Sequence, residues 1–196
     1  DDSISFVGNE LAKLNKNLFK KPVLVFHLSG CKKSTEIPKL SWGFRASFHP
    51  CTSFATAEQS ATSLEKVYFA IESASETKLY QKQLFLLARD LKGIPFSIKT
   101  KDKTLYHLAL VFACNYLVTL QSIAQKVLKK TNIDNKHIVQ LLFPLLNQTI
   151  NNIKVFGISE SLTGPIVRND ITTLRDHQKC LKHIKDKNIE ELYRLL

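Results

Sequence analysis

Two short segments place polar side chains directly after apolar runs. The run VLVFHL (residues 23–28) is followed by Ser29 and Gly30, and the run RASF (residues 45–48) is followed by His49. Ligands of open α/β sheets bind beyond the carboxyl ends of the strands, so we expect Ser29 and Gly30 to line such a site. A histidine there can donate a proton or a hydrogen bond to a substrate. The alternatives are an ordinary strand-ending turn and a His49 ring bonded to a loop carbonyl.

A third candidate lies near the C-terminus, in the segment GPIVRND that ends at Asp170. Gly164 and Pro165 fix a tight bend, and the helix that follows presents free N–H groups at its start. Together with Arg168, these groups predict an anion site. In the alternative reading, Asn169 or Asp170 only caps the helix and Arg168 is solvated.

The longest uncharged stretch runs from Thr104 to Gln125 and contains no Asp, Glu, Lys or Arg. A helix of that length can cross a bilayer. At about 100° per residue, however, most of its polar side chains, including His107 and Asn115, fall on one narrow stripe. We therefore expect a buried helix of a soluble protein rather than a membrane span. The stripe forms either a hydrogen-bonded network between helices or one wall of a cleft.

Several well-known catalytic motifs are absent from the sequence. The six glycines form neither a G-x-G-x-x-G nor a Walker loop, and neither G-x-S-x-G nor H-E-x-x-H occurs. These residues alone therefore specify no reaction. Four widely spaced cysteines without a C-x-x-C pair, and an N-terminus without a signal-peptide pattern, favour reduced thiols in a cytoplasmic protein and no metal site.

The chain carries a formal net charge of +11, which raises the question of nucleic-acid binding. The basic excess is spread over both halves of the sequence. The densest cluster, in residues 179–187, has no aromatic side chain between its lysines. A solvated basic face explains this pattern better, so we expect no nucleic-acid partner.

The order of predicted elements indicates an α/β part followed by an all-helical part. Before residue 100, four strands and two helices are predicted, one helix near the N-terminus and one from a Ser75 cap to Gly93. Only helices are predicted after residue 100. We expect a partial Rossmann-like parallel sheet in residues 1–99 and an all-helical bundle in residues 100–196. Because no methionine occurs and the pattern opens with a helix, we expect further strands before Asp1. The predicted strands are residues 23–28, 45–48, 67–71 and 94–98.

Three motifs give the sequence a resemblance to a known family. They are S-F-H-P (residues 47–50), Y-H (residues 106–107) with N-Y (residues 115–116), and L-T-G-P-I-x-R-x-D (residues 162–170). The chain resembles bacterial proteins in which a Rossmann-like NADP-oxidoreductase domain precedes a helical domain of unknown function, of the DUF2520 type. That family is similar to pyrroline-5-carboxylate reductases and 6-phosphogluconate dehydrogenases.

The resemblance implies NADP as cofactor, a homodimer formed through the helical domain, and a small, anionic substrate bound in an interdomain cleft. It implies that His107 or His49 donates a proton and that Asn115 orients the substrate. It places Ser29, Gly30 and Pro50 at the cofactor, and the substrate-binding residues are then Thr163, Gly164, Arg168 and Asp170. The glycine-rich loop of the family is not in this sequence, so we expect weak dinucleotide binding by the chain as given. The alternative is a non-catalytic ligand-binding or dimerisation module with the same fold.

Overall fold

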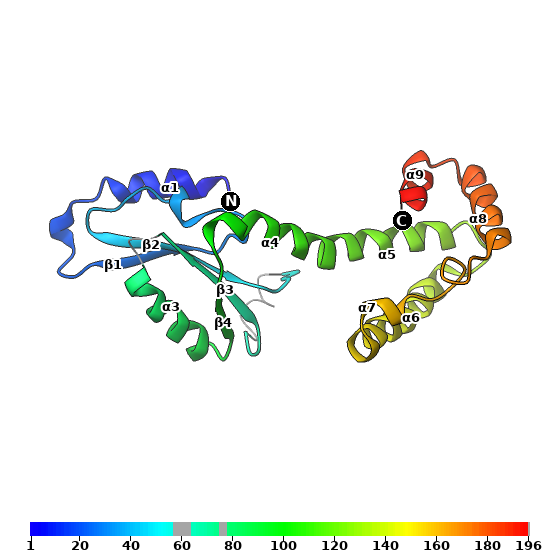
Figure 1. Cartoon of the computed structure of the whole chain (residues 1–196). Helices are drawn as coiled ribbons and strands as arrows, with labels where there is room; N and C mark the ends of the chain where they lie inside the picture. The colour runs from blue at the N-terminus through cyan, green and yellow to red at the C-terminus, as the bar shows by residue number, and fades with distance from the viewer. Residues whose placement is uncertain (57–63, 75–77, 196) are drawn as a thin grey trace. The chain divides into compact units, whose positions relative to one another are not determined.

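The computed structural model describes residues 1–56, 64–74 and 78–195 (Figure 1). Within them the chain forms two compact units, Asp1–Asn115 and Tyr116–Leu196. The first contains the sheet and the second contains only helices. The functional division at residues 99 and 100 stays a prediction.

All four predicted strands are present and form one sheet in the order β1-β2-β3-β4. The sheet is mixed rather than parallel throughout, because β2 and β3 are antiparallel while the other two pairs are parallel. A parallel pair needs a long crossover connection. The described parts of the connection between β2 and β3 contain no helix, and β3 runs antiparallel beside β2. The strands are β1 (Val23–His27), β2 (Gly43–Pro50), β3 (Tyr68–Ser73) and β4 (Ile94–Ser97).

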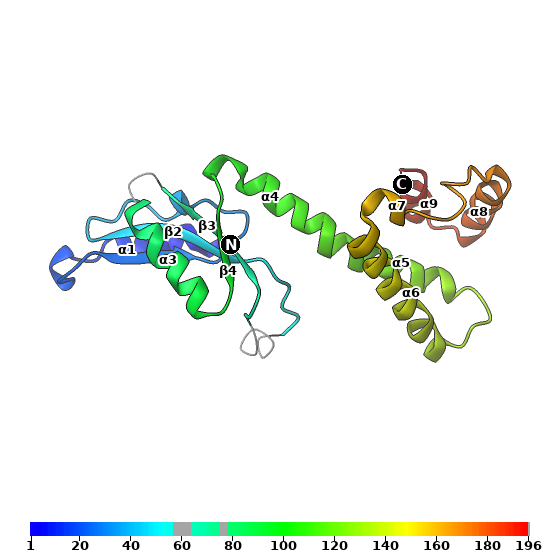
Figure 2. The same cartoon turned by 60° about the horizontal axis from the view of Figure 1, so that its bottom comes forward.

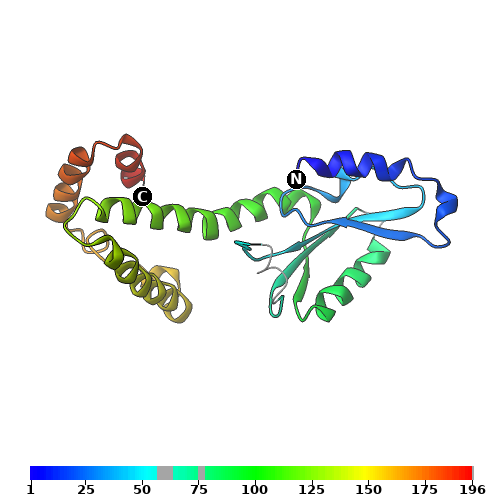
Figure 3. The ribbon, with the colours of Figure 1, turned by 180° about the vertical axis from the view of Figure 1, so that it is seen from behind.

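Helices cover both faces of this sheet, with α1 on one side and α3 on the other (Figures 1 and 3). Alternate strand residues such as Phe48 and Phe69 pack against Leu84 and Ala88 of α3 and form the main core. The Ser75 cap predicted for α3 lies outside the described residues. The helical segments of this unit are α1 (Ser3–Ala12), η1 (Lys16–Leu18), η2 (Ser34–Glu36), α3 (Lys78–Asp90), η4 (Thr100–Asp102), α4 (Lys103–Leu110) and η5 (Val111–Asn115).

The long helix predicted from Thr104 to Gln125 is present as α4, one π-helical turn (η5) and α5 (Tyr116–Leu128). Among the described residues, one helix, Thr100–Leu128, has the length and hydropathy of a membrane span, which by itself is weak support for one. None of its most apolar window is buried within the chain. The predicted burial is therefore wrong for a single chain, because an apolar periodicity indicates that a face needs cover but not which molecule supplies it.

The second unit is built from α5 and four further helices (Figure 2). Asp134 caps α6 by accepting a hydrogen bond from the Lys136 amide, and Pro144 lies inside this helix without ending it. Gly157, at a φ of 84°, ends it. Asp170 caps α8, which settles the choice between Asn169 and Asp170 as the cap. The four helices are α6 (Asn135–Phe156), α7 (Ile158–Ser161), α8 (Ile171–Ile184) and α9 (Lys187–Leu195).

Candidate functional site

A row of buried polar residues crosses the sheet near the carboxyl ends of β1 and β2. His27 pairs with Ser47, and Ser47 pairs with Glu72 of β3. Residues directly opposite each other in a sheet share a face, so these three side chains lie on the same side. Their exposed fractions are 8%, 0% and 0%. The opposite face carries Phe48 and the apolar core. One face of the sheet is therefore polar and closed to solvent at this end, whereas further back on the same face Val25 packs against Ile37, Leu40 and Trp42.

Lys103, the first residue of α4, ends on this polar row although its side chain is only 1% exposed. Its ammonium nitrogen donates hydrogen bonds to the Ser29 carbonyl oxygen at 3.1 Å and to the Ser47 hydroxyl. Ser47 also donates to the Ser29 carbonyl, at 3.2 Å. Burial lowers the pKa of Lys103 to about 8, while Glu72 and then Cys31 raise it. The lysine thereby fixes the turn after β1 and stays mostly charged at neutral pH.

Glu72 and His27 are held by the segments around them. The Glu72 carboxylate accepts from the Ser34 amide at 2.7 Å, the Ser34 hydroxyl at 3.0 Å and the Thr100 hydroxyl at 2.6 Å. The Ser29 amide donates to Nδ1 of His27, so Nε2 carries the proton and donates to a backbone carbonyl at 3.0 Å. Burial lowers the pKa of His27, which keeps it neutral. These bonds determine where the Ser29–Gly30 turn lies.

Gly30 is the point where the two candidate histidines meet. A Cβ atom built on Gly30 would lie 2.8 Å from Cδ2 of His107 and 2.8 Å from Nε2 of His49. Cδ2 of His107 and Nε2 of His49 are therefore at most about 5.6 Å apart, because each lies 2.8 Å from the same point. Only glycine leaves room for this approach. The structure thus brings together three residues that the sequence placed in separate segments.

His49 is held from its other side by Tyr106. Nδ1 of His49 lies 3.0 Å from the Tyr106 hydroxyl oxygen, and the two rings meet edge to face. Burial lowers the pKa of His49 to about 4, with further contributions from Lys103 and His107. Burial, and then a hydrogen bond with the Cys51 side chain, raises the pKa of Tyr106. Both side chains are therefore neutral at physiological pH, and His49 offers its Nε2 to the Gly30 side.

Two further predicted residues are Pro50, which directly follows His49, and Asn115, eight residues after His107. Pro50 ends β2 and pairs with Phe69 of β3. Asn115 is exposed at the end of the π-helical turn. The prediction that Asn115 shares a stripe with His107 assumed about 100° per residue, and the π turn between them changes that angle.

The loop before α8 is part of the second unit and is described by itself. Gly164 has a φ of +94°, which favours glycine at the bend. The Asp170 carboxylate accepts from the Thr173 amide at 3.1 Å and from the Thr173 hydroxyl at 2.7 Å. These bonds lower the pKa of Asp170. The carboxylate thus occupies the start of α8, where the prediction placed an anion, while Thr163 and Arg168 are exposed.

The sequence predictions missed Lys103, Ser47, Glu72 and Tyr106 as site residues. A signal for the first was available, because Lys103 precedes His107 by four residues and so shares its helix face. Ser47 and His49 alternate with Ala46 and Phe48, which is the pattern of a strand with one polar face.

A family model described as a domain of unknown function, DUF2520, matches residues 67–196. In a sequence comparison no curated protein matched the chain. Several solved structures are similar to the chain. Protein TM1727 from Thermotoga maritima has a TM-score of 0.74 and 26% sequence identity, over 100% of this chain and 73% of that chain.

Two other solved structures share the fold at lower identity. BF3122 from Bacteroides fragilis, provisionally named an NADP oxidoreductase, has a TM-score of 0.74 and 20% identity, over 99% of this chain and 69% of that chain. The pyrroline carboxylate reductase of Plasmodium falciparum, solved with NADP bound, has a TM-score of 0.54 and 10% identity, over 99% of this chain and 74% of that chain. The resemblance and the fold class derived from the sequence are confirmed: the chain has an oxidoreductase-like α/β fold with an attached helical part.

Proposed function

Because the chain belongs to the DUF2520 family, we propose that it is an NADP-dependent oxidoreductase acting on a small, anionic metabolite. The observation that carries this proposal is the convergence of His49 and His107 on Gly30, at the carboxyl end of β1. In open α/β sheets that edge is where ligands bind. Pyrroline carboxylate reductase, a protein of similar fold, was solved with NADP bound.

The residues at this edge fit such a cofactor. Gly30 is buried and carries no side chain, and its turn is fixed by the bonds of Lys103 and His27 to Ser29. Ser29, Gly30 and Pro50 would hold the cofactor there. When bound, the nicotinamide supplies or accepts the hydride. The protein must then supply the proton that accompanies hydride transfer to a carbonyl or imine.

We assign the proton transfer to His107 rather than His49. A pKa near 4 leaves very little of His49 protonated at neutral pH, so His49 acts as a neutral hydrogen-bonding group. Asn115 orients the substrate, and Thr163, Gly164 and Arg168 recognise its anionic group, while Asp170 holds their loop at the start of α8. The capping bonds of Asp170 favour a positioning role for that residue.

We propose a homodimer formed through the helical unit, in the cytoplasm, without a membrane or nucleic-acid partner. Large apolar side chains on α5 and α6 are exposed in the single chain, among them Val118 (70%), Leu145 (62%) and Phe156 (62%). Apolar area of this extent marks an interaction surface. Sedimentation at micromolar concentration is expected to give twice the mass of the chain, and a monomer would contradict the proposal.

The reaction is tested by following NADPH oxidation with the full-length natural protein and a panel of small keto, imino and aldehyde carboxylates and phosphates. At least one compound should be reduced, and His107→Ala should lower kcat by about 10²-fold or more. The matched control is His183→Ala, which changes an exposed histidine on α8. Turnover that survives unchanged in His107→Ala would remove His107 from the reaction.

A further inference from the structure

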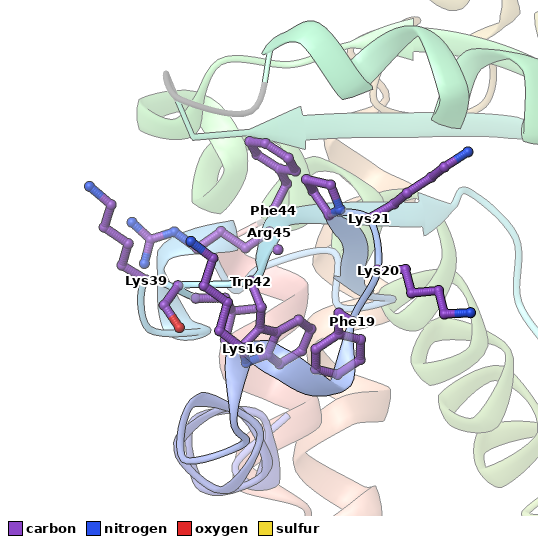
Figure 4. Close-up of a pocket in the computed structure, with 12 residues that line it drawn as sticks. Lys16, Phe19, Lys20, Lys21, Lys39, Trp42, Phe44 and Arg45 are labelled. Carbon is purple, nitrogen blue, oxygen red and sulfur yellow. The ribbon is translucent and has the colours of Figure 1, made fainter.

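A pocket of about 380 Å³ opens where β1 and β2 begin (Figure 4). It is lined by η1, by the loop that enters β1 and by the loop that enters β2. None of the described residues that line it is acidic. Five are basic, namely Lys16, Lys20, Lys21, Lys39 and Arg45.

The four lysines of this pocket keep their positive charge available to a ligand. Within the described ranges, none of the four lysines is in an ion pair. Figure 4 shows the nitrogen ends of Lys16, Lys39 and Arg45 on the same side of Trp42. The Arg45 guanidinium is fixed because its Nη1 donates to the Ile37 carbonyl at 2.7 Å. A concave site lined by positive charges attracts and concentrates anions.

Trp42 gives the pocket a rigid wall with an unused donor. It is 4% exposed and stacks on Phe19 with a centroid distance of 4.2 Å. Its indole Nε1 is buried and has no hydrogen-bond partner. Buried N–H groups in proteins are nearly always satisfied, so an unpaired one beside a cationic pocket indicates an acceptor that binds there.

We propose that this pocket binds a small phosphorylated molecule. A phosphate group presents several acceptor oxygens and can bond an arginine and two lysines together, which suits this arrangement better than a single carboxylate does. Nucleic acid fits less well, because single strands bind by stacking bases on open aromatic faces. Trp42 is buried against Phe19, and Phe44 is stacked on Tyr80 at 3.8 Å.

This pocket is separate from the proposed cofactor edge. It lies at the start of β1 and β2, whereas Gly30 and His49 follow or end these strands. The five residues of β1 span about 16 Å at roughly 3.3 Å per residue. Occupation of one site does not require the other.

The test uses Trp42 as its own reporter, because it is the single tryptophan of the chain. Inorganic pyrophosphate is titrated at constant ionic strength while tryptophan fluorescence is recorded. We expect a saturable change, and an apparent Kd raised about tenfold in Lys39→Ala and in Arg45→Lys. Lys39 is exposed, so its removal does not threaten folding, and circular dichroism checks Arg45→Lys. Lys182→Ala, a matched change on exposed α8, should leave the Kd unchanged.

Three results would overturn the proposal. They are a fluorescence change that sodium chloride reproduces, a Kd that does not move in Lys39→Ala, and saturable, steeply salt-dependent binding of a single-stranded oligonucleotide that pyrophosphate does not displace. His107→Ala, which alters the proposed reaction site, should leave the pyrophosphate titration unchanged. The phosphate proposal and the oxidoreductase proposal therefore fail separately.

Discussion

Nδ1 of His49 lies 3.0 Å from the hydroxyl oxygen of Tyr106, a residue 57 positions further along the chain. This bond joins the end of β2 to α4 and turns the other ring nitrogen of His49 toward Gly30. The geometry of the candidate site therefore depends on a contact between two elements that are distant in sequence.

Removing the Tyr106 hydroxyl tests that contact. Tyr106→Phe should lower the free energy of unfolding by about 1 kcal/mol, because Nδ1 of a partly buried His49 loses its partner. Urea denaturation measures the change. The second unit offers a matched control, since His177 and Tyr193 make the same bond at 2.8 Å in an exposed position. Tyr193→Phe should cost less, and an equal cost in both variants would show that burial at Tyr106 contributes nothing.

The lowered pKa of His49 predicts a pH dependence of stability. The folded protein holds His49 neutral down to about pH 4, whereas the unfolded chain protonates it near 6.5. The contribution of neutral His49 to the free energy of unfolding is therefore complete above pH 6.5 and is lost as pH falls toward 4. After allowance for solvent screening, we expect roughly 2 kcal/mol of this loss to disappear in His49→Gln. Unfolding curves at pH 7.5 and 4.5 give the comparison, and parallel losses in both proteins would contradict it.

Lys103 should show its effect at alkaline pH. Its pKa is about 8 in the folded protein and about 10.5 in the unfolded chain, so the folded state disfavours the charged form. Stability should rise with pH between 8 and 10.5, by roughly 1–2 kcal/mol between pH 7.5 and 9.5 relative to Lys103→Met. Denaturation at these two pH values measures this. A wild-type protein that loses stability relative to Lys103→Met over this range would show the opposite pKa shift.

Variants of Asp170 and Arg168 distinguish helix capping from substrate binding. Asp170→Ala should lower the Tm, because the amide and hydroxyl of Thr173 lose their acceptor. Asp170→Ser retains a cap and should recover most of the loss. Arg168→Ala should leave the Tm unchanged and raise KM for an anionic substrate. A lower Tm in Arg168→Ala would assign that residue to structure instead.

The sequence was sufficient to predict the four strands and the helical second part, because apolar runs and periodic patterns reflect local burial. It also identified His49, Gly30 and His107 individually. Their meeting could not be predicted, since it depends on how α4 lies over the sheet. The antiparallel return of β3 was missed because periodicity does not specify strand direction.

Two other differences have identifiable physical causes. Lys103 was not expected in the core, because a lysine at the start of a helix is usually solvated. Its burial is tolerated through the hydrogen bonds to Ser29 and Ser47. The apolar helix from Thr104 to Gln125 was expected to be buried, but its sequence could not show whether the same chain or a second copy covers it.

The most direct test of the oxidoreductase proposal is a titration of the full-length natural protein with NADPH, followed by the fluorescence of the nicotinamide. We predict saturable NADPH binding that Gly30→Leu weakens at least tenfold, because a side chain at Gly30 would displace the His49 and His107 rings. Lys182→Leu, which introduces the same side chain at an exposed position of α8, serves as the control and should bind as tightly as the wild type. Absence of saturable binding by the wild type, or equal affinity in Gly30→Leu, would contradict the assignment of this edge as the cofactor site.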